Sequence, residues 1–237
     1  MSVTLAARRW GQKIAGLLTG LPIVSAPALF FFAVEQGDVF ASEASRAVLV
    51  SLVGVEASAV AYAWASLRTP WWGSLLTSWS VFFACVLVLQ RLNWSVNVAL
   101  VAACLGLVAA QLALPRAGRI ATGTRPVWDL PLRVFSAMLL VITVTSLARR
   151  LGPTLSGALT PFPVAISVLM AFSHAQLGSG GAITFLRGFL PGMWAFTAFC
   201  YVLAVVIVPL GTALGFVVSL GLTLAMQAGV LWWMRRA

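Results

Sequence analysis

The chain has little charge for its length. Only 8% of its 237 residues are Asp, Glu, Lys or Arg, whereas a soluble domain carries about 25%. Such a chain cannot cover a compact surface with water-compatible side chains, which excludes an ordinary soluble domain. Short segments of alternating polarity, typical of a membrane β-barrel, are also lacking. With 61% hydrophobic residues and a mean hydropathy of +1.02, the composition predicts an all-α polytopic membrane protein.

Chemically reactive side chains are scarce. The chain has one histidine, His174, five acidic residues and three cysteines, Cys85, Cys104 and Cys200, which lie inside apolar runs without metal-ligand spacing. It has no glycine-rich phosphate-binding loop. These absences leave no set of groups for a hydrolase or a metal centre. We therefore expect no catalytic residue, no metal and no cofactor, and the expected role of the cysteines is packing.

The net charge of +10 raises the question of a nucleic-acid partner. The arginines, however, lie singly or in pairs at the ends of apolar runs. Positive charge at such places anchors and orients membrane helices. The expected partner is therefore the lipid bilayer and not a nucleic acid.

Hydropathy predicts about eight transmembrane helices, because apolar runs of about 20 residues match the ~30 Å hydrocarbon thickness of a bilayer. A polar stretch at 115–130 separates a first membrane half, 1–114, from a second half, 131–237, and is expected to be a cytoplasmic linker loop. The predicted spans are 12–33, 44–67, 71–91, 94–114, 131–149, 153–174, 183–208 and 212–233.

Eight crossings place both chain ends on one side of the membrane. Eleven Lys and Arg residues then fall on that side and four on the other. Cytoplasmic loops carry such an excess of positive residues. The chain is therefore expected to be a multi-pass protein of the bacterial inner (plasma) membrane with cytoplasmic N- and C-termini.

The sequence contains an internal duplication. Residues 7–49 and 148–190 align without gaps at a shift of 141, and 13 of the 43 pairs are identical. Shared hydrophobicity does not align three arginines, a threonine and a proline, so we interpret the match as a true repeat. The full repeat, 7–91 and 148–233, contains three spans, and five crossings separate each equivalent pair. Because five is odd, the sequence predicts an inverted repeat of three helices.

Inverted repeats recur in secondary transporters, where an exchange of conformation between the two halves exposes a central site to either side in turn. The chain is therefore interpreted as a small-molecule secondary transporter, with a small polar or anionic solute as its unknown partner. The alternative is a non-transporting membrane scaffold or subunit, or an envelope-biogenesis factor. A homo-oligomer is compatible with either interpretation.

Proline-broken helices are the first candidate site. The pattern Gly-x-x-Thr-x-x-Pro occurs in both copies, at 16–22 and 157–163, and Pro27 predicts a second break in the first copy. A proline frees a backbone carbonyl, which in lipid must face protein or water. We expect a central substrate site, while a tight helix crossing through glycine contacts is the alternative. The expected substrate-binding residues are Thr19, Pro22, Ser25, Thr160, Pro163 and Ser167.

Three charged residues complete the candidate set. Glu56 lies deep within a span, where a charge costs about 2.5–3.5 kcal/mol. It either couples transport to a proton or cation, or makes a structural hydrogen bond as a neutral acid; its repeat counterpart is Thr197. Arg46 and Arg187 begin equivalent helices. They either attract an anionic substrate and gate the two entrances, or extend to the lipid headgroups.

The second copy resembles the small GlpM-type inner-membrane proteins. The resemblance rests on three short motifs within about 153–208 and is weaker over 12–67, where Ala47 and Ser51 replace two glycines. Members of that family are single short units, so the resemblance implies a duplicated, two-unit relative in an inner membrane. It implies no particular activity. The motif residues are Gly157, Phe162, Pro163, Leu186, Arg187, Gly188, Gly192, Met193 and Trp194.

Overall fold

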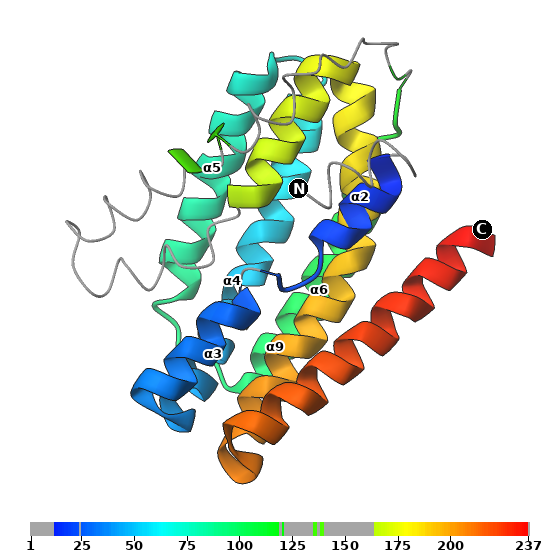
Figure 1. Cartoon of the computed structure of the whole chain (residues 1–237). Helices are drawn as coiled ribbons and strands as arrows, with labels where there is room; N and C mark the ends of the chain where they lie inside the picture. The colour runs from blue at the N-terminus through cyan, green and yellow to red at the C-terminus, as the bar shows by residue number, and fades with distance from the viewer. Residues whose placement is uncertain are drawn as a thin grey trace.

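The structure is a computed structural model that describes residues 12–23, 25–118, 120, 135–136, 138–139 and 164–236. Within these residues every regular element is an α-helix, which confirms the predicted all-α class. The helices pack side by side as one bundle (Figure 1). They are α2 (Gln12–Thr19), α3 (Ser25–Gln36), α4 (Asp38–Ala65), α5 (Trp71–Leu89), α6 (Val96–Ala113) and α9 (Val164–Arg236).

The helix α9 consists of three consecutive segments. A straight helix of its 73 residues would be about 110 Å long, far longer than a bilayer is thick. The backbone leaves the helical conformation at Gly178 (φ 71°) and Gly211 (φ 77°), where a positive φ carries no steric penalty for glycine. The chain reverses at both positions (Figure 1). We call 164–177, 179–210 and 212–236 the first, second and third segments of α9.

The helix α4 lies at the centre of the bundle. It contacts α3, α5, α6 and α9, and buried residues occur along almost its whole length. It runs antiparallel to the second segment of α9, and Ser42 Oγ donates a hydrogen bond to Ala204 O at 2.6 Å. The largest fully buried side chains of the core include Tyr62, Phe82, Phe185 and Phe199.

The outer helices present apolar side chains outward. Leu112 of α6 and Val217 of the third segment of α9 are 83% and 67% exposed. Exposed hydroxyl groups on these helices donate to carbonyls of their own helix; Thr77 Oγ1, for example, donates to Gly73 O at 3.0 Å. Lipid offers no hydrogen-bond partners, so a hydroxyl group that faces lipid needs such a partner within the protein. Among the described residues, four helices are long and apolar enough to cross a membrane: α4, α5, α6 and α9 over 166–232. The apolar helices are compatible with an integral membrane protein and indicate a membrane location.

The first predicted span differs most from the observed helices. Where one helix over 12–33 is predicted, α2 and α3 are separated by an irregular segment. The chain then reverses at Gly37 (φ 91°), so α4 begins six residues earlier than predicted. The second break predicted at Pro27 is wrong. Pro27 lies in the first turn of α3, where the N–H that proline lacks would have no helical partner.

The later spans agree more closely. The predicted spans 71–91 and 94–114 correspond to α5 and α6 with ends that differ by at most two residues. Most of the predicted fifth span, most of the 115–130 linker and the beginning of the sixth span lie outside the described residues; within the fifth span, 135–136 and 138–139 are described and helical. The total of eight spans and the inverted repeat stay predictions at this level.

Candidate functional site

The chain between α2 and α3 is irregular inside the bundle. Pro22 lacks the N–H that a continuous helix would need, and short-range bonds replace the helical ones. Gly20 N donates to Leu17 O at 3.1 Å, and Ile23 N donates to Leu21 O at 2.8 Å. Because α3 has 12 residues, this break lies about 18 Å from the turn between α3 and α4. That distance is near mid-depth in a hydrocarbon layer of ~30 Å.

At the break, α2 packs backbone to backbone against the second segment of α9. A Cβ atom on Gly20 would lie 2.5 Å from the carbonyl carbon of Gly192, and one on Gly192 would lie 2.5 Å from Leu17 O. A Cβ atom on Gly16 would meet the backbone of Phe185 in the same way. Paired small residues permit such close crossings in membranes. The first copy of the motif therefore forms the tight crossing that was the alternative to a binding site.

The carbonyls that precede the break have protein partners. Thr19 Oγ1 donates to Ala15 O at 2.8 Å. Gln227 Nε2, from the third segment of α9, donates to Leu17 O at 2.7 Å. The end of α2 is thus held between the second and third segments of α9, and the carbonyls of Ala15 and Leu17 have side-chain donors from the protein itself.

The predicted site residues do not all meet at the break. Thr19 and Pro22 lie there, Pro22 is buried, and Ser25 is the half-buried first residue of α3. Ser167 is buried in the first segment of α9, where its Oγ accepts a hydrogen bond at 3.0 Å from Trp79 Nε1 of α5. Thr160 and Pro163 lie outside the described residues.

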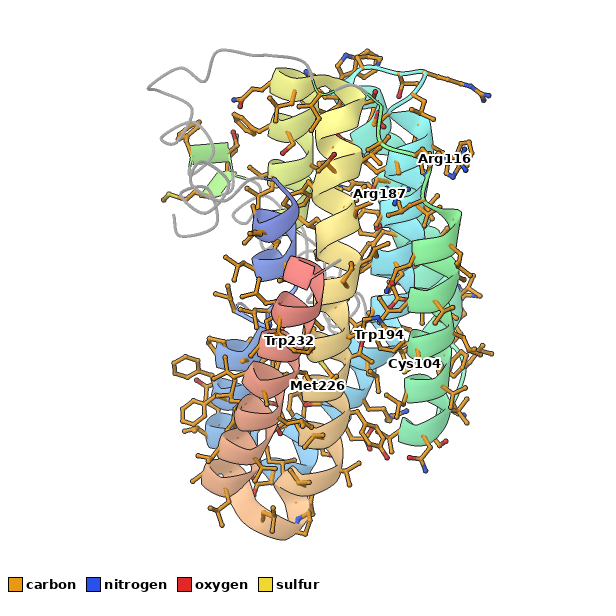
Figure 2. The ribbon with its side chains drawn as sticks, turned by 90° about the vertical axis from the view of Figure 1, so that its right-hand side faces the viewer. Cys104, Arg116, Arg187, Trp194, Met226 and Trp232 are labelled. Carbon is orange, nitrogen blue, oxygen red and sulfur yellow. The ribbon has the colours of Figure 1, made fainter. Side chains whose placement is uncertain are left out.

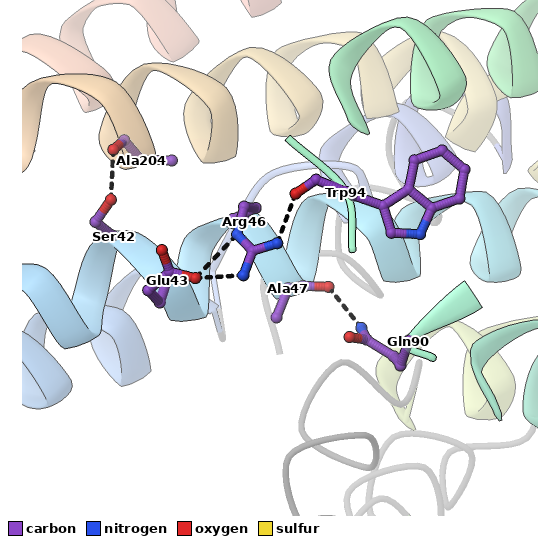
Figure 3. Close-up of polar contacts among 7 residues, drawn as sticks. All are labelled: Ser42, Glu43, Arg46, Ala47, Gln90, Trp94 and Ala204. Carbon is purple, nitrogen blue, oxygen red and sulfur yellow. Dashed lines mark hydrogen bonds and ion pairs between the residues drawn. The ribbon is translucent and has the colours of Figure 1, made fainter. Parts of the chain in front are cut away.

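The two repeat-related arginines contact opposite ends of α6. Arg46 Nη1 donates to Trp94 O at 2.6 Å, just before α6 begins, and its guanidinium pairs with Glu43 (Figure 3). Arg187 Nη2 donates to Pro115 O at 3.1 Å, just after α6 ends (Figure 2). Both guanidinium groups thus fix the position of α6. Attraction of an anionic solute by these arginines stays a prediction.

Glu56 is enclosed between α4 and α6. Its side chain is 1% exposed, and neither carboxyl oxygen has a hydrogen-bond partner. Gly106 of α6 makes room for it, because a Cβ atom there would collide with Oε2. Thr197, its counterpart in the repeat, is also buried with an unpartnered hydroxyl. The interpretation of Glu56 as a structural hydrogen-bonding acid therefore finds no partner in the described part of the chain.

Sequence reasoning missed three contacts. Gly188 and Gly192 are four residues apart, a spacing typical of close helix crossings, so the α2–α9 contact had a readable signal. Gln227 is an isolated amide in an apolar run and could have been singled out in the same way. The third contact joins Tyr62 OH to His174 Nδ1 at 3.4 Å; these residues are 112 apart, and no local pattern predicts such a pair.

A small apolar recess lies apart from the break. Its volume is about 40 Å³, room for little more than water, and it lies among α4, α5 and α6. No group of three His, Cys, Asp or Glu that could hold a metal ion occurs among the described residues. The recess is lined by Val50, Val53, Leu89, Trp94, Ala99 and Ala102.

No protein-family model matches the chain, and no curated protein or solved structure matches it. The observed helices define its class as an all-α chain with membrane-compatible apolar helices. A more particular assignment has to come from the arrangement of its own residues.

Proposed function

We propose that the chain is a small-molecule secondary transporter of a bacterial inner membrane, built from two inverted copies of a three-helix unit. One observation carries the proposal. Gly37 (φ 91°, ψ 168°) and Gly178 (φ 71°, ψ −174°), which are 141 residues apart, adopt nearly the same conformation. Each joins a preceding helix, α3 or the first segment of α9, to the long helix that follows it.

The helix boundaries support the same repeat. Adding 141 to the last residue of α3, the first of α4 and the first of α5 gives 177, 179 and 212. At these positions the first segment of α9 ends and its second and third segments begin. The turn at Gly37 lies at one end of the bundle and the turn at Gly178 at the other (Figure 1). Opposite directions for the two copies account for this arrangement.

The break between α2 and α3 lies close to the axis that would relate the two copies. Ser42 of α4 is hydrogen-bonded to Ala204 of α9. Leu52 lies ten residues after Ser42, and Met193 lies eleven residues before Ala204. The repeat-equivalent residues Leu52 and Met193 therefore lie level on antiparallel helices. Gly192, which contacts the break, is the neighbour of Met193. A substrate site at the two proline-broken segments would thus be central, as a transporter of this design requires.

The charge distribution supports the predicted orientation with cytoplasmic termini. Loops at the cytoplasmic face carry an excess of Arg and Lys. Among the arginines whose side chains are described, three lie toward the Gly178 end of the bundle, and two lie with three acidic residues toward the Gly37 end. The first group is Arg68, Arg116 and Arg187, and the second is Arg46, Arg91, Glu35, Asp38 and Glu43.

The proposed substrate is a small polar or anionic solute, bound by Thr19, Pro22 and Ser25 of one copy and Thr160, Pro163 and Ser167 of the other. Arg46 and Arg187 would attract it from the two faces. The chain is also proposed to be a two-unit relative of the GlpM-type proteins. The described conformation is then a closed one, because α2 and α9 are in backbone contact at the break.

A second candidate is favoured by that same packing. A non-transporting scaffold or subunit, or an envelope-biogenesis factor, would need a dry and rigid centre. The glycine crossing of α2 and α9 and the small size of the apolar recess fit this requirement.

A binding screen separates the two candidates. The purified full chain in lipid nanodiscs is heated with metabolites, amino acids, organic acids and lipid precursors. A transporter predicts a saturable rise in melting temperature with one chemical class, which Thr19→Val weakens. Thr77→Val is the matched control, because Thr77 makes the same type of bond to a carbonyl four residues earlier but is exposed on α5. No response to any class, together with a co-purifying partner protein, would contradict the transporter.

A further inference from the structure

Among the described residues, Glu56 has no counter-charge in its surroundings. It lies on the face of α4 that meets α6, and its carboxyl group fills the notch left by Gly106 (Cβ contact with Oε2). Val53 of α4 borders the same notch. Cys104 of α6 interacts electrostatically with this carboxyl (Figure 2 marks its position).

A charged carboxylate would be unfavourable in that place. Both oxygens lack hydrogen-bond donors, and an ionised carboxyl group without donors or a cation is strongly destabilised in an apolar interior. Glu56 is therefore held as the neutral acid while α4 and α6 are in contact. It can ionise only in a state in which the two helices separate and water reaches it.

This dependence links protonation to conformation. If the closed state binds a proton that the open state releases, then the proton gradient shifts the equilibrium between the states, and the change of state moves the proton. The small apolar recess lies beside the same groove, since Val53 lines both the recess and the Gly106 notch. A small separation of α6 from α4 there would admit water to Glu56.

We propose that Glu56 is the proton carrier of this chain: its O–H bond is kept while α4 and α6 are closed, and breaks when they open, with the proton passing to water and the electron pair staying on the carboxylate. The inference rests on the proposed transporter function and deepens it, because proton exchange would supply the driving force for solute movement. The inference places the proton-binding site between α4 and α6, away from the proposed substrate site at the broken helices.

Other titratable groups around α4 have to be separated from Glu56. They are Cys104 of α6, Cys85 of α5, and Tyr62 of α4 with its partner His174 of α9. Of these, His174 is the group whose charge ordinarily changes near neutral pH. The variant His174→Gln therefore serves as the control for any pH response.

Infrared difference spectroscopy tests the protonation directly. The full chain in nanodiscs is compared with Glu56→Gln from mildly acidic to mildly alkaline pH. We expect the C=O band of a protonated carboxylic acid in the wild type at neutral pH, a shift of that band in heavy water, and its loss in the variant. Absence of the band at neutral pH would overturn the inference. If Glu56→Gln does not fold, Glu56→Asp is used instead, and its C=O band should lie at a different frequency from that of the wild type.

Labelling of Cys104 by a water-soluble maleimide tests the link to opening. Cys85 and Cys200 are first replaced by alanine. The labelling rate of Cys104 in the chain with Glu56, divided by the rate in Glu56→Gln, should then rise with pH. The rise should approach about tenfold per pH unit below the pH at which the open state becomes the major one. His174→Gln should keep this rise, and Gly106→Ala, which displaces the carboxyl group, should abolish it. A pH profile shared with Glu56→Gln would contradict a proton carrier. Neither readout uses a solute, so a failed solute screen would remove the proposed function without removing these results.

Discussion

The backbone contact between α2 and α9 depends on glycines that carry no side chain. Because a Cβ atom on Gly192 would lie 2.5 Å from Leu17 O, the substitution Gly192→Ala must separate α2 from α9. We expect a loss of about 1–3 kcal/mol in stability, typical of overpacking, measured by thermal unfolding of the purified chain in detergent. Gly221→Ala is the control, since a Cβ atom there meets nothing within 4 Å. Equal melting temperatures for the two variants would mean that the backbones are not in contact.

The amide of Gln227 is expected to stabilise the end of α2. Replacing Gln227 by leucine removes its bond to Leu17 O and should cost about 1 kcal/mol, since hydrogen bonds within membrane proteins are of this modest size. Gln111→Leu is the matched control, because Gln111 Nε2 has no hydrogen-bond partner. Chemical denaturation of both variants provides the measurement. A larger loss in Gln111→Leu than in Gln227→Leu would contradict the assignment.

Residue types alone indicated some of these roles. An acid in an apolar run and two proline motifs stand out in any reading of the sequence, and Glu56 and the break at Pro22 are indeed the unusual features of the core. The contact partner of each residue could not be predicted from the sequence. Arg46 and Arg187 reach α6 through carbonyls about 50 and 70 residues away in the chain, and backbone carbonyls carry no sequence signal.

At the scale of the helices, glycines determine where the chain reverses. Gly37 and Gly178 combine φ values of 91° and 71° with ψ values of 168° and −174°, a region essentially restricted to glycine, in which a Cβ atom costs about 1–3 kcal/mol. Gly37→Ala and Gly178→Ala should therefore destabilise the chain by similar amounts in thermal unfolding. Gly229→Ala, on the third segment of α9 and with open space around it, should have little effect. Tolerance of one of the two substitutions would contradict their equivalence.

Hydropathy predicted the helices better than the turns between them. For α5 and α6, apolar runs flanked by polar residues set both ends within two residues. It missed that α3 and α4 are separated by one residue, because the polar residues at 35–38 resemble a loop but belong to the two helix ends on either side of Gly37. It located the other two reversals more closely, because Gly178 lies between the predicted spans 153–174 and 183–208 and Gly211 lies between 183–208 and 212–233.

At the scale of the whole molecule, the central claim is that two copies of one unit face opposite ways. Shared residues at a fixed shift predicted it, and the matching breaks at Gly37 and Gly178 support it. The identity of the solute could not be predicted in the same way. The hydroxyl groups of Thr19 and Ser167 bond to other groups of the protein, so their arrangement does not indicate which solute they would bind.

Accessibility from the two sides of the membrane tests that claim most directly. Glu35→Cys and Ala175→Cys place exposed thiols within three residues of Gly37 and Gly178, in a chain whose native cysteines are replaced by alanine. Intact cells are treated with a membrane-impermeant maleimide before and after permeabilisation. We predict that the thiol at 35 reacts in intact cells and that the thiol at 175 reacts only after permeabilisation. Reaction of both thiols from the same side would contradict the inverted repeat.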